Sequence, residues 1–141
     1  MKLSCINFIH TNKQPASQSN GVKFTIIYCG VVKCKGYSSR EITPYIYDNP
    51  FPHYAVNCIA EIKDNNGEWV NIGWVVMPYN GGHGVRATQY GDKIHLYVGD
   101  IYIHSYSNGA NEKYLYTPGG IYGQTSAECR IKVWSIGKLK K

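Results

Sequence analysis

The side chains that could carry chemistry in this chain are its histidines and cysteines, with five of each. They are His10, His53, His83, His95 and His104, and Cys5, Cys29, Cys34, Cys58 and Cys129. A zinc site requires ligands that converge at short, defined spacings, and neither set has such spacings. No nucleophile is paired with a base in a recognisable motif. We therefore predict no metal site, no cofactor and no catalytic residue, and we do not expect an enzyme.

The cysteines also indicate the compartment in which the chain is made. Their number is odd, and Cys58 and Cys129 occupy inward positions of expected strands, where a free thiol acts as a small apolar side chain. Cys34, between Lys33 and Lys35, is electrostatically the best placed for activation. The pattern indicates a reducing compartment. No apolar run approaches the length of a membrane span, so we expect no membrane insertion.

The composition favours a protein whose surface is partly covered. Charged residues make up only 17% of the chain, and tyrosine is abundant, with 13 copies. A charged fraction this low indicates coverage by symmetry mates or by a ligand. The net charge is +6, but three of these charges lie in a basic tail at residues 138–141, and the body has only three arginines. Nucleic-acid binders usually cluster arginine with aromatic residues, so we do not expect nucleic acid as a partner.

The clearest structural pattern lies in residues 54–77, where two alternating runs flank the turn sequence Asp64-Asn65-Asn66-Gly67. This arrangement predicts a β-hairpin. The first arm places Val56, Cys58, Ala60 and Ile62 on one face, with Asn57 and Glu61 opposite, and the second arm places Val70, Ile72, Trp74 and Val76 on one face. Such alternation predicts that one face of each arm lies in a core.

The rest of the chain also indicates strands. We expect them at residues 3–10, 22–29 (continuing to 34 past a kink at Gly30), 45–47, 85–90, 93–98, 101–106, 114–117 and 127–136. Residues 77–84 are expected to form a flexible turn, and no window keeps a helical period. The sequence predicts an all-β fold, an antiparallel β-sandwich or barrel-like single domain spanning residues 1–141, with long loops.

Binding is the function that the residue types favour most. Loops and strand ends combine aromatic rings, amides and glycines, a mixture that suits sugars and protein epitopes because rings stack and amides form hydrogen bonds. The candidate ligand-binding residues are Tyr79, Asn80, His83, Arg86, Tyr106, Asn108, Tyr114 and Tyr116. Trp69 and Trp134 occupy outward positions of their strands, where they could serve an interface or cover a neighbouring loop.

Two stretches of the second half share a rhythm of glycines and alternating apolar residues. They are residues 91–99, with the sequence GDKIHLYVG, and residues 127–138, with the sequence AECRIKVWSIGK. This rhythm resembles that of the C-terminal receptor-binding domains of bacteriophage tail fibres. The resemblance implies a homotrimeric knob that binds a surface glycan, lipopolysaccharide or outer-membrane protein. It also implies a place on the virion surface after assembly in the host cytoplasm.

Two other functions are compatible with the residues. The chain could be a small cytoplasmic protein that sequesters a nucleotide or another anionic metabolite, with Arg86, Arg130 and lysines meeting phosphate. It could also be a hydrolase that uses His83 or His104. Host-surface receptor binding remains the first hypothesis, because aromatic and amide residues are more plentiful in the expected loops than charged ones.

Overall fold

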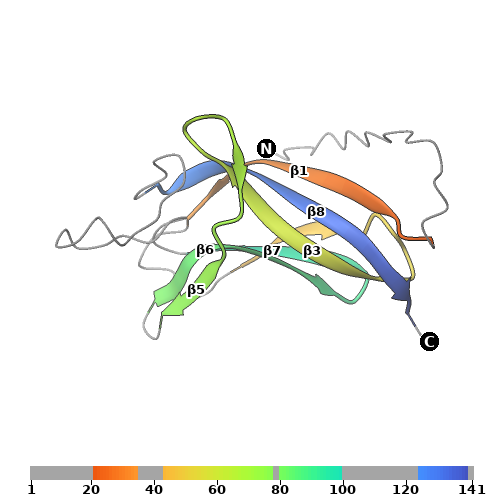
Figure 1. Cartoon of the computed structure of the whole chain (residues 1–141). Helices are drawn as coiled ribbons and strands as arrows, with labels where there is room; N and C mark the ends of the chain where they lie inside the picture. The colour runs from red at the N-terminus through yellow and green to blue at the C-terminus, as the bar shows by residue number, and fades with distance from the viewer. Residues whose placement is uncertain (1–20, 35–42, 78–79, 100–123, 140–141) are drawn as a thin grey trace, which may run out of the picture.

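The computed structural model describes residues 21–34, 43–77, 80–99 and 124–139. Within these ranges the fold is all-β, as predicted, and two four-stranded antiparallel sheets lie in separate layers (Figure 1). The first sheet has the order β1 (Phe24–Lys33), β8 (Ser126–Lys138), β3 (Tyr54–Lys63) and β4 (Trp69–Val70). The second has the order β2 (Tyr45–Asp48), β7 (Lys93–Val98), β6 (Asn80–Tyr90) and β5 (Trp74–Met77). The described part contains no helix long and apolar enough to span a membrane. The strands expected at residues 3–10, 101–106 and 114–117 lie outside the described residues.

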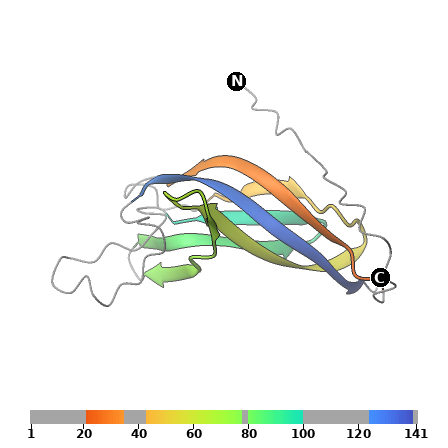
Figure 2. The same cartoon turned by 45° about the horizontal axis from the view of Figure 1, so that its top comes forward.

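The long strand β8 is the centre of the first sheet. It lies between β1 and β3, as both views show (Figures 1 and 2): β1 pairs with residues 126–134 and β3 with residues 129–138. Its alternation confirms the prediction, since Cys129, Ile131 and Val133 are buried while Arg130 and Lys132 are on the outer face. A strand that alternates in this way buries one face and leaves the other to solvent or to a partner.

The core lies between the two sheets. Its fully buried side chains include Ile62 and Ile131 from the first sheet and Ile94 and Leu96 from the second. Burial of each such side chain stabilises the fold by about 1.5–3 kcal/mol relative to exposure. The first arm of the expected hairpin confirms its inward face, with Val56, Ala60 and Ile62 buried and Cys58 packed against the core. The expected short strand at residues 45–47 is also present, as the edge strand β2.

The second arm of the expected hairpin was predicted wrongly. Only Trp69 and Val70 pair with β3; the chain then crosses at residues 71–73 and enters the second sheet as β5. The cause is a local turn in which the Asn71 side-chain Oδ1 accepts a hydrogen bond from the Gly73 N–H, 2.9 Å away. Gly73 has a φ of +71°, which other residues rarely adopt. The turn therefore prevails over the alternating pattern, and Trp74 does not share a strand with Val70.

The flexible turn expected at residues 77–84 was also predicted wrongly. Residues 80–84 begin β6, which therefore starts five residues before the expected position and pairs with β5. Gly84, one of the glycines of residues 80–84, allows the backbone of β6 to approach the backbone of the crossover segment closely. A Cβ atom on Gly84 would lie 2.0 Å from the Gly73 carbonyl oxygen. Only glycine at position 84 lets β6 pass this close to the crossover segment.

The kink expected at Gly30 is confirmed as a β-bulge. The register of β1 against β8 shifts between Tyr28 and Gly30, and Gly30 has a φ of +69°. The strand then continues to Lys33, and Val32 is fully buried. Its start differs from the prediction by two residues, because Val22 lies outside the strand and is exposed. The bulge lets the strand bend while it keeps its pairing with β8.

The turn after β3 depends on the side chain of Asp64. Its Oδ1 accepts hydrogen bonds from the backbone N–H groups of Asn66 at 2.9 Å and Glu68 at 2.8 Å. The change Asp64→Ala removes both bonds, so we expect the free energy of unfolding to fall by about 1 kcal/mol. Asp64→Asn keeps an acceptor oxygen and is the matched control. Urea denaturation should show a smaller loss of unfolding free energy for Asp64→Asn than for Asp64→Ala. Equal losses in the two variants would contradict a role for the Oδ1 acceptor.

Candidate functional site

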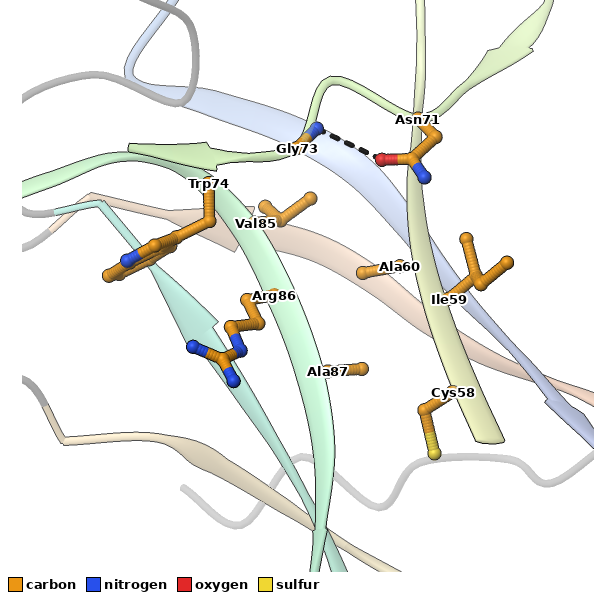
Figure 3. Close-up of a pocket in the computed structure, with 9 residues that line it drawn as sticks. All are labelled: Cys58, Ile59, Ala60, Asn71, Gly73, Trp74, Val85, Arg86 and Ala87. Atoms are coloured by element: carbon orange, nitrogen blue, oxygen red, sulfur yellow. Dashed lines mark hydrogen bonds between the residues drawn. The ribbon is translucent and has the colours of Figure 1, made fainter. Parts of the chain in front are cut away.

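One hollow of the described structure, which we call the inter-sheet hollow, lies where β3 and β6, from different sheets, run beside the crossover segment. Its volume is about 330 Å³. It is lined by Cys58, Ile59, Ala60, Asn71, Gly73, Trp74, Val85, Arg86 and Ala87 (Figure 3). Ala60, Gly73 and Ala87 leave this space open because their side chains are small or absent. The crossover closes one end of the hollow, so its shape depends on the turn at residues 71–73.

A second hollow adjoins the first on the outer face of the second sheet. It measures about 300 Å³ and is lined by Trp74, Arg86, Thr88 and Tyr97. Trp74 and Arg86 line both hollows, and Figure 3 shows their side chains extending together away from β3. We call the two hollows together the Trp74–Arg86 site. Because Trp74 and Arg86 line both hollows, a ligand that contacts these two residues can reach either hollow.

Aromatic rings follow one another on this outer face. Residues directly opposite in an antiparallel pair point to the same side, and Arg86 is opposite Tyr97. The Trp74 and Tyr97 rings meet edge to face, with centroids 6.4 Å apart and planes at 69°. His95 continues the series, 6.2 Å from Tyr97 and 5.0 Å from Tyr90 between ring centroids. The result is a row of π surfaces beside a hollow.

Arg86 gives the site its charge. It is exposed and forms no ion pair with any described residue. No aspartate or glutamate is among the described residues that line either hollow. An arginine without a neighbouring carboxylate can offer its planar group of N–H donors to a carboxylate, phosphate or sulfate of a ligand. The site is therefore electrostatically suited to an anionic or acceptor-rich ligand.

The candidate residues named from the sequence separate into three groups. Arg86 is in the site. Asn80 and His83 belong to β6. His83 is half-buried, is not among the residues that line either hollow, and its backbone pairs with that of Val75. The remaining five, Tyr79, Tyr106, Asn108, Tyr114 and Tyr116, lie outside the described residues.

Sequence reasoning missed Trp74, Tyr97 and Asn71. Tyr97 could have been found, because the alternation of residues 93–98 already places it on the outer face. Trp74 could not be assigned correctly, because the expected hairpin placed it in the wrong sheet. Asn71 carries no pattern of its own and matters through the turn that it forms with Gly73.

The outer face of the first sheet carries an ion cluster centred on Glu61. Its Oε2 accepts hydrogen bonds from Arg130 Nε at 2.7 Å and Nη2 at 2.6 Å, and its Oε1 accepts one from Lys132 Nζ at 2.6 Å. Burial opposes ionisation of Glu61, but the hydrogen bonds from Lys132 and Arg130 outweigh it and hold the pKa below its usual value. Only 8% of the Glu61 side chain is exposed, so Glu61 does not lie in solvent as its position on the outer face suggested. A carboxylate held by two cations is unsuited to act as a base at neutral pH.

The two outward tryptophans lie at either end of this cluster. The Arg130 guanidinium lies 4.6 Å from the Trp69 ring centroid, and the Trp134 ring lies 5.1 Å from that of Phe24. Both tryptophans are half-buried. Within the described residues they therefore act as cover for charged and aromatic neighbours.

The described thiols differ in their chemistry. Burial raises the pKa of Cys58, which lines the inter-sheet hollow, to about 11, so this thiol stays protonated at neutral pH. Cys34 is half-buried and packs against the core. The thiol with a lowered pKa is Cys29, which the sequence did not single out. The described ranges contain no group of three or more His, Cys, Asp or Glu side chains that could hold a metal ion.

Comparison of the chain with protein-family models, with curated proteins and with solved structures found no match.

Proposed function

We propose that this protein recognises a ligand on the surface of a host cell, without catalysis, and that the Trp74–Arg86 site receives a glycan. The observation that carries the proposal is that Trp74 and Arg86 line both adjoining hollows. An aromatic face stacks on the apolar side of a sugar ring, while charged and amide donors bond its oxygens. The volume of about 330 Å³ suits a short saccharide.

Each side chain of the site has a distinct part in this proposal. Trp74 supplies the stacking surface, and Tyr97 supports it from the side through their edge-to-face contact. Asn71 contributes its side-chain N–H₂ group, since its Oδ1 is already engaged by the Gly73 N–H. Arg86 binds an acidic substituent of the glycan through paired hydrogen bonds.

We propose that the protein acts as the tip of a viral fibre and assembles as a homotrimer on the virion surface. Besides the resemblance, exposed apolar side chains on the first sheet support assembly. Phe24, Val31 and Ile136 are 51%, 58% and 70% exposed, and exposed apolar side chains are stabilised when another copy of the chain covers them. Light scattering on a gel-filtration column should give three times the mass of the chain. A monomer would contradict the assembly proposal and leave the ligand site to be tested separately.

The change Arg86→Ala should weaken binding of an acidic host-surface oligosaccharide about tenfold or more, because it removes a cation that has no ion-pair partner among the described residues. Trp74→Ala should have a similar effect through lost stacking. Isothermal titration, with a ligand chosen by a glycan array, measures both changes. Lys93→Ala is the matched control, since Lys93 is a cation on the same sheet face that lines neither hollow and pairs with Asp48 at 2.7 Å. Unchanged affinity in both site variants would overturn the assignment of the site.

Sequestration of a nucleotide or another anionic metabolite is the second candidate. It is favoured by the same unpaired Arg86 in a site without described acidic residues. A ligand that binds only the folded state raises the unfolding temperature with ligand concentration relative to Kd. A thermal-shift screen with a nucleotide panel should then give a positive shift that Arg86→Ala abolishes. No shift across the panel would remove this candidate.

A further inference from the structure

Two cysteines face each other across the bulge of the first sheet. The bulge gives β1 one extra residue, so that Cys29 and Gly30 together lie opposite Cys129 of β8. Both cysteines pack on the inner side, where Cys129 is 1% exposed and Cys29 is half-buried. Opposite residues in an antiparallel pair are the closest side-chain neighbours that a sheet offers.

Cys29 and Tyr47, which come from different sheets, both pack against the core that includes Cys129. Each thiol lies near a backbone carbonyl oxygen of its own strand, Cys29 Sγ at 3.8 Å from that of Ile27 and Cys129 Sγ at 3.9 Å from that of Arg130. Hydrogen bonding with Cys129 and with Tyr47 lowers the pKa of Cys29, and the bond with Cys129 lowers it more than burial raises it. The same bond, together with burial, raises the pKa of Cys129 far above its usual value. Of the pair, Cys29 therefore loses its proton more readily than Cys129.

We propose that Cys29 and Cys129 are a redox pair that closes into a cross-strand disulfide by exchange with a small disulfide such as oxidised glutathione. In the first step the Cys29 thiolate attacks one sulfur of glutathione disulfide. A mixed disulfide forms on Cys29, the glutathione S–S bond breaks, and one glutathione thiolate leaves and takes up a proton from solvent.

In the second step Cys129 resolves the mixed disulfide. Its sulfur attacks the Cys29 sulfur and its proton passes to the departing glutathione, so the Cys29–Cys129 bond forms as the second glutathione thiol leaves. The two cysteines lose two electrons, and one glutathione disulfide becomes two thiols. The roles follow from burial: half-buried Cys29 can meet the oxidant, whereas Cys129 is reached only through Cys29.

The position of Cys29 allows this chemistry. In the described part of the fold, β1 is the last strand of its sheet, and it bends at the bulge beside Cys29. Small movements there can bring the two Cβ atoms to the separation of about 3.5–4.5 Å that a disulfide needs. Closure fastens the edge strand covalently to the central strand β8, whereas the dithiol leaves them joined by non-covalent contacts, such as the backbone ladder and the contact between the Phe24 and Trp134 rings.

Thiol trapping on the full chain tests the pair. The reduced protein is equilibrated in glutathione buffers of increasing disulfide content, alkylated with N-ethylmaleimide and analysed by intact mass and peptide mapping. We expect loss of two alkylation sites in a Cys29–Cys129 linked peptide, and an unfolding temperature higher by roughly 5 °C or more. Independent alkylation of both cysteines at every ratio, or a crosslink that joins either of them elsewhere, would overturn the proposal.

Serine variants separate the two roles. Cys129→Ser should stop at a single glutathione adduct on Cys29, and Cys29→Ser should leave Cys129 reduced. Cys58→Ser is the matched control and should close like the wild type, because Cys58 lies on β3 and no other thiol hydrogen-bonds to it among the described residues. A measurement on the wild type does not depend on folding of the variants: Cys29 should react with iodoacetamide faster than Cys58 near neutral pH. Equal rates would contradict activation of Cys29.

Discussion

The change Gly84→Ala should lower the free energy of unfolding by about 3 kcal/mol, because it adds a side chain where two backbone segments nearly touch. The added Cβ would lie 2.0 Å from the Gly73 carbonyl oxygen and 3.1 Å from the Trp74 Cα. Gly84 also has a φ of +99°, which costs any other residue about 1–2 kcal/mol. Since the clashing atoms are backbone, relief requires the crossover to move, and the hydrogen bond from the Val85 N–H to the Gly73 oxygen is lost with it.

Gly91→Ala is the matched control for this substitution. Gly91 also has a positive φ, +59°, but a Cβ there would meet nothing within 4 Å. The change Gly91→Ala should therefore lower the free energy of unfolding only by the conformational strain of a positive φ, about 1 kcal/mol. Urea denaturation at neutral pH compares the two variants. Equal losses of unfolding free energy would show that the close approach of Gly84 to Gly73 does not contribute to the effect. Gly84→Ala should also weaken ligand binding, because Gly73 and Trp74 line the Trp74–Arg86 site.

The second large effect is expected from Glu61→Ala, with a loss of about 3 kcal/mol. The change leaves Arg130 and Lys132 without their shared carboxylate, on side chains that are only 19% and 27% exposed. Removal of one member of a buried ion cluster leaves uncompensated charge, which costs more than the cluster contributed as a whole. Glu128→Ala provides the contrast: Glu128 pairs with Lys63 at 3.6 Å, both side chains are exposed, and the loss should stay below about 0.5 kcal/mol. A loss of similar size in both variants would contradict this interpretation.

The same carboxylate makes stability depend on pH in a defined direction. The pKa of Glu61 in the folded state lies below the ordinary value of 4.5. The stabilisation is therefore complete above the unfolded-state pKa and is lost as the pH falls through the lower, folded-state pKa. The variant Glu61→Gln has no carboxyl group to titrate at this position. Between about pH 5 and about pH 2, a range that begins near the ordinary carboxyl pKa, the free energy of unfolding of this variant should therefore fall less than that of the wild type. Parallel pH curves would mean that Glu61 does not contribute to acid unfolding.

The sequence predicts a strand correctly where one physical effect, the burial of one face of the strand, determines its structure. In β7 and in residues 127–133 of β8 apolar residues occupy every second position, and these residues are buried as expected. The second arm of the hairpin shows the limit of this reasoning. Val70 and Trp74 fit one alternating pattern, yet an Asn71–Gly73 turn sends Trp74 to another sheet. Which sheet receives a strand depends on long-range pairing that periodicity does not encode.

The site was predictable only in part, for a related reason. Arg86 was named as a residue that could bind an anionic ligand, and it lies in the hollow. Its partner Trp74 joins it only through the crossover, and the space between β3 and β6 exists because small residues such as Ala60 and Ala87 meet there. A hollow between two sheets is a property of their packing, so the sequence of either strand alone does not indicate it.

The central position of β8 has a mechanical consequence. A load applied along the chain at Lys138 pulls on a strand that is hydrogen-bonded to β1 on one side and to β3 on the other. The load runs along β8, so it shears the two ladders of hydrogen bonds that join β8 to β1 and to β3. In this geometry many hydrogen bonds carry the load at the same time and do not open one after another from one end. The domain should therefore unfold slowly under tension, and resistance to pulling is governed by the unfolding rate rather than by equilibrium stability. A protein that holds a particle to a surface under flow would gain from this arrangement.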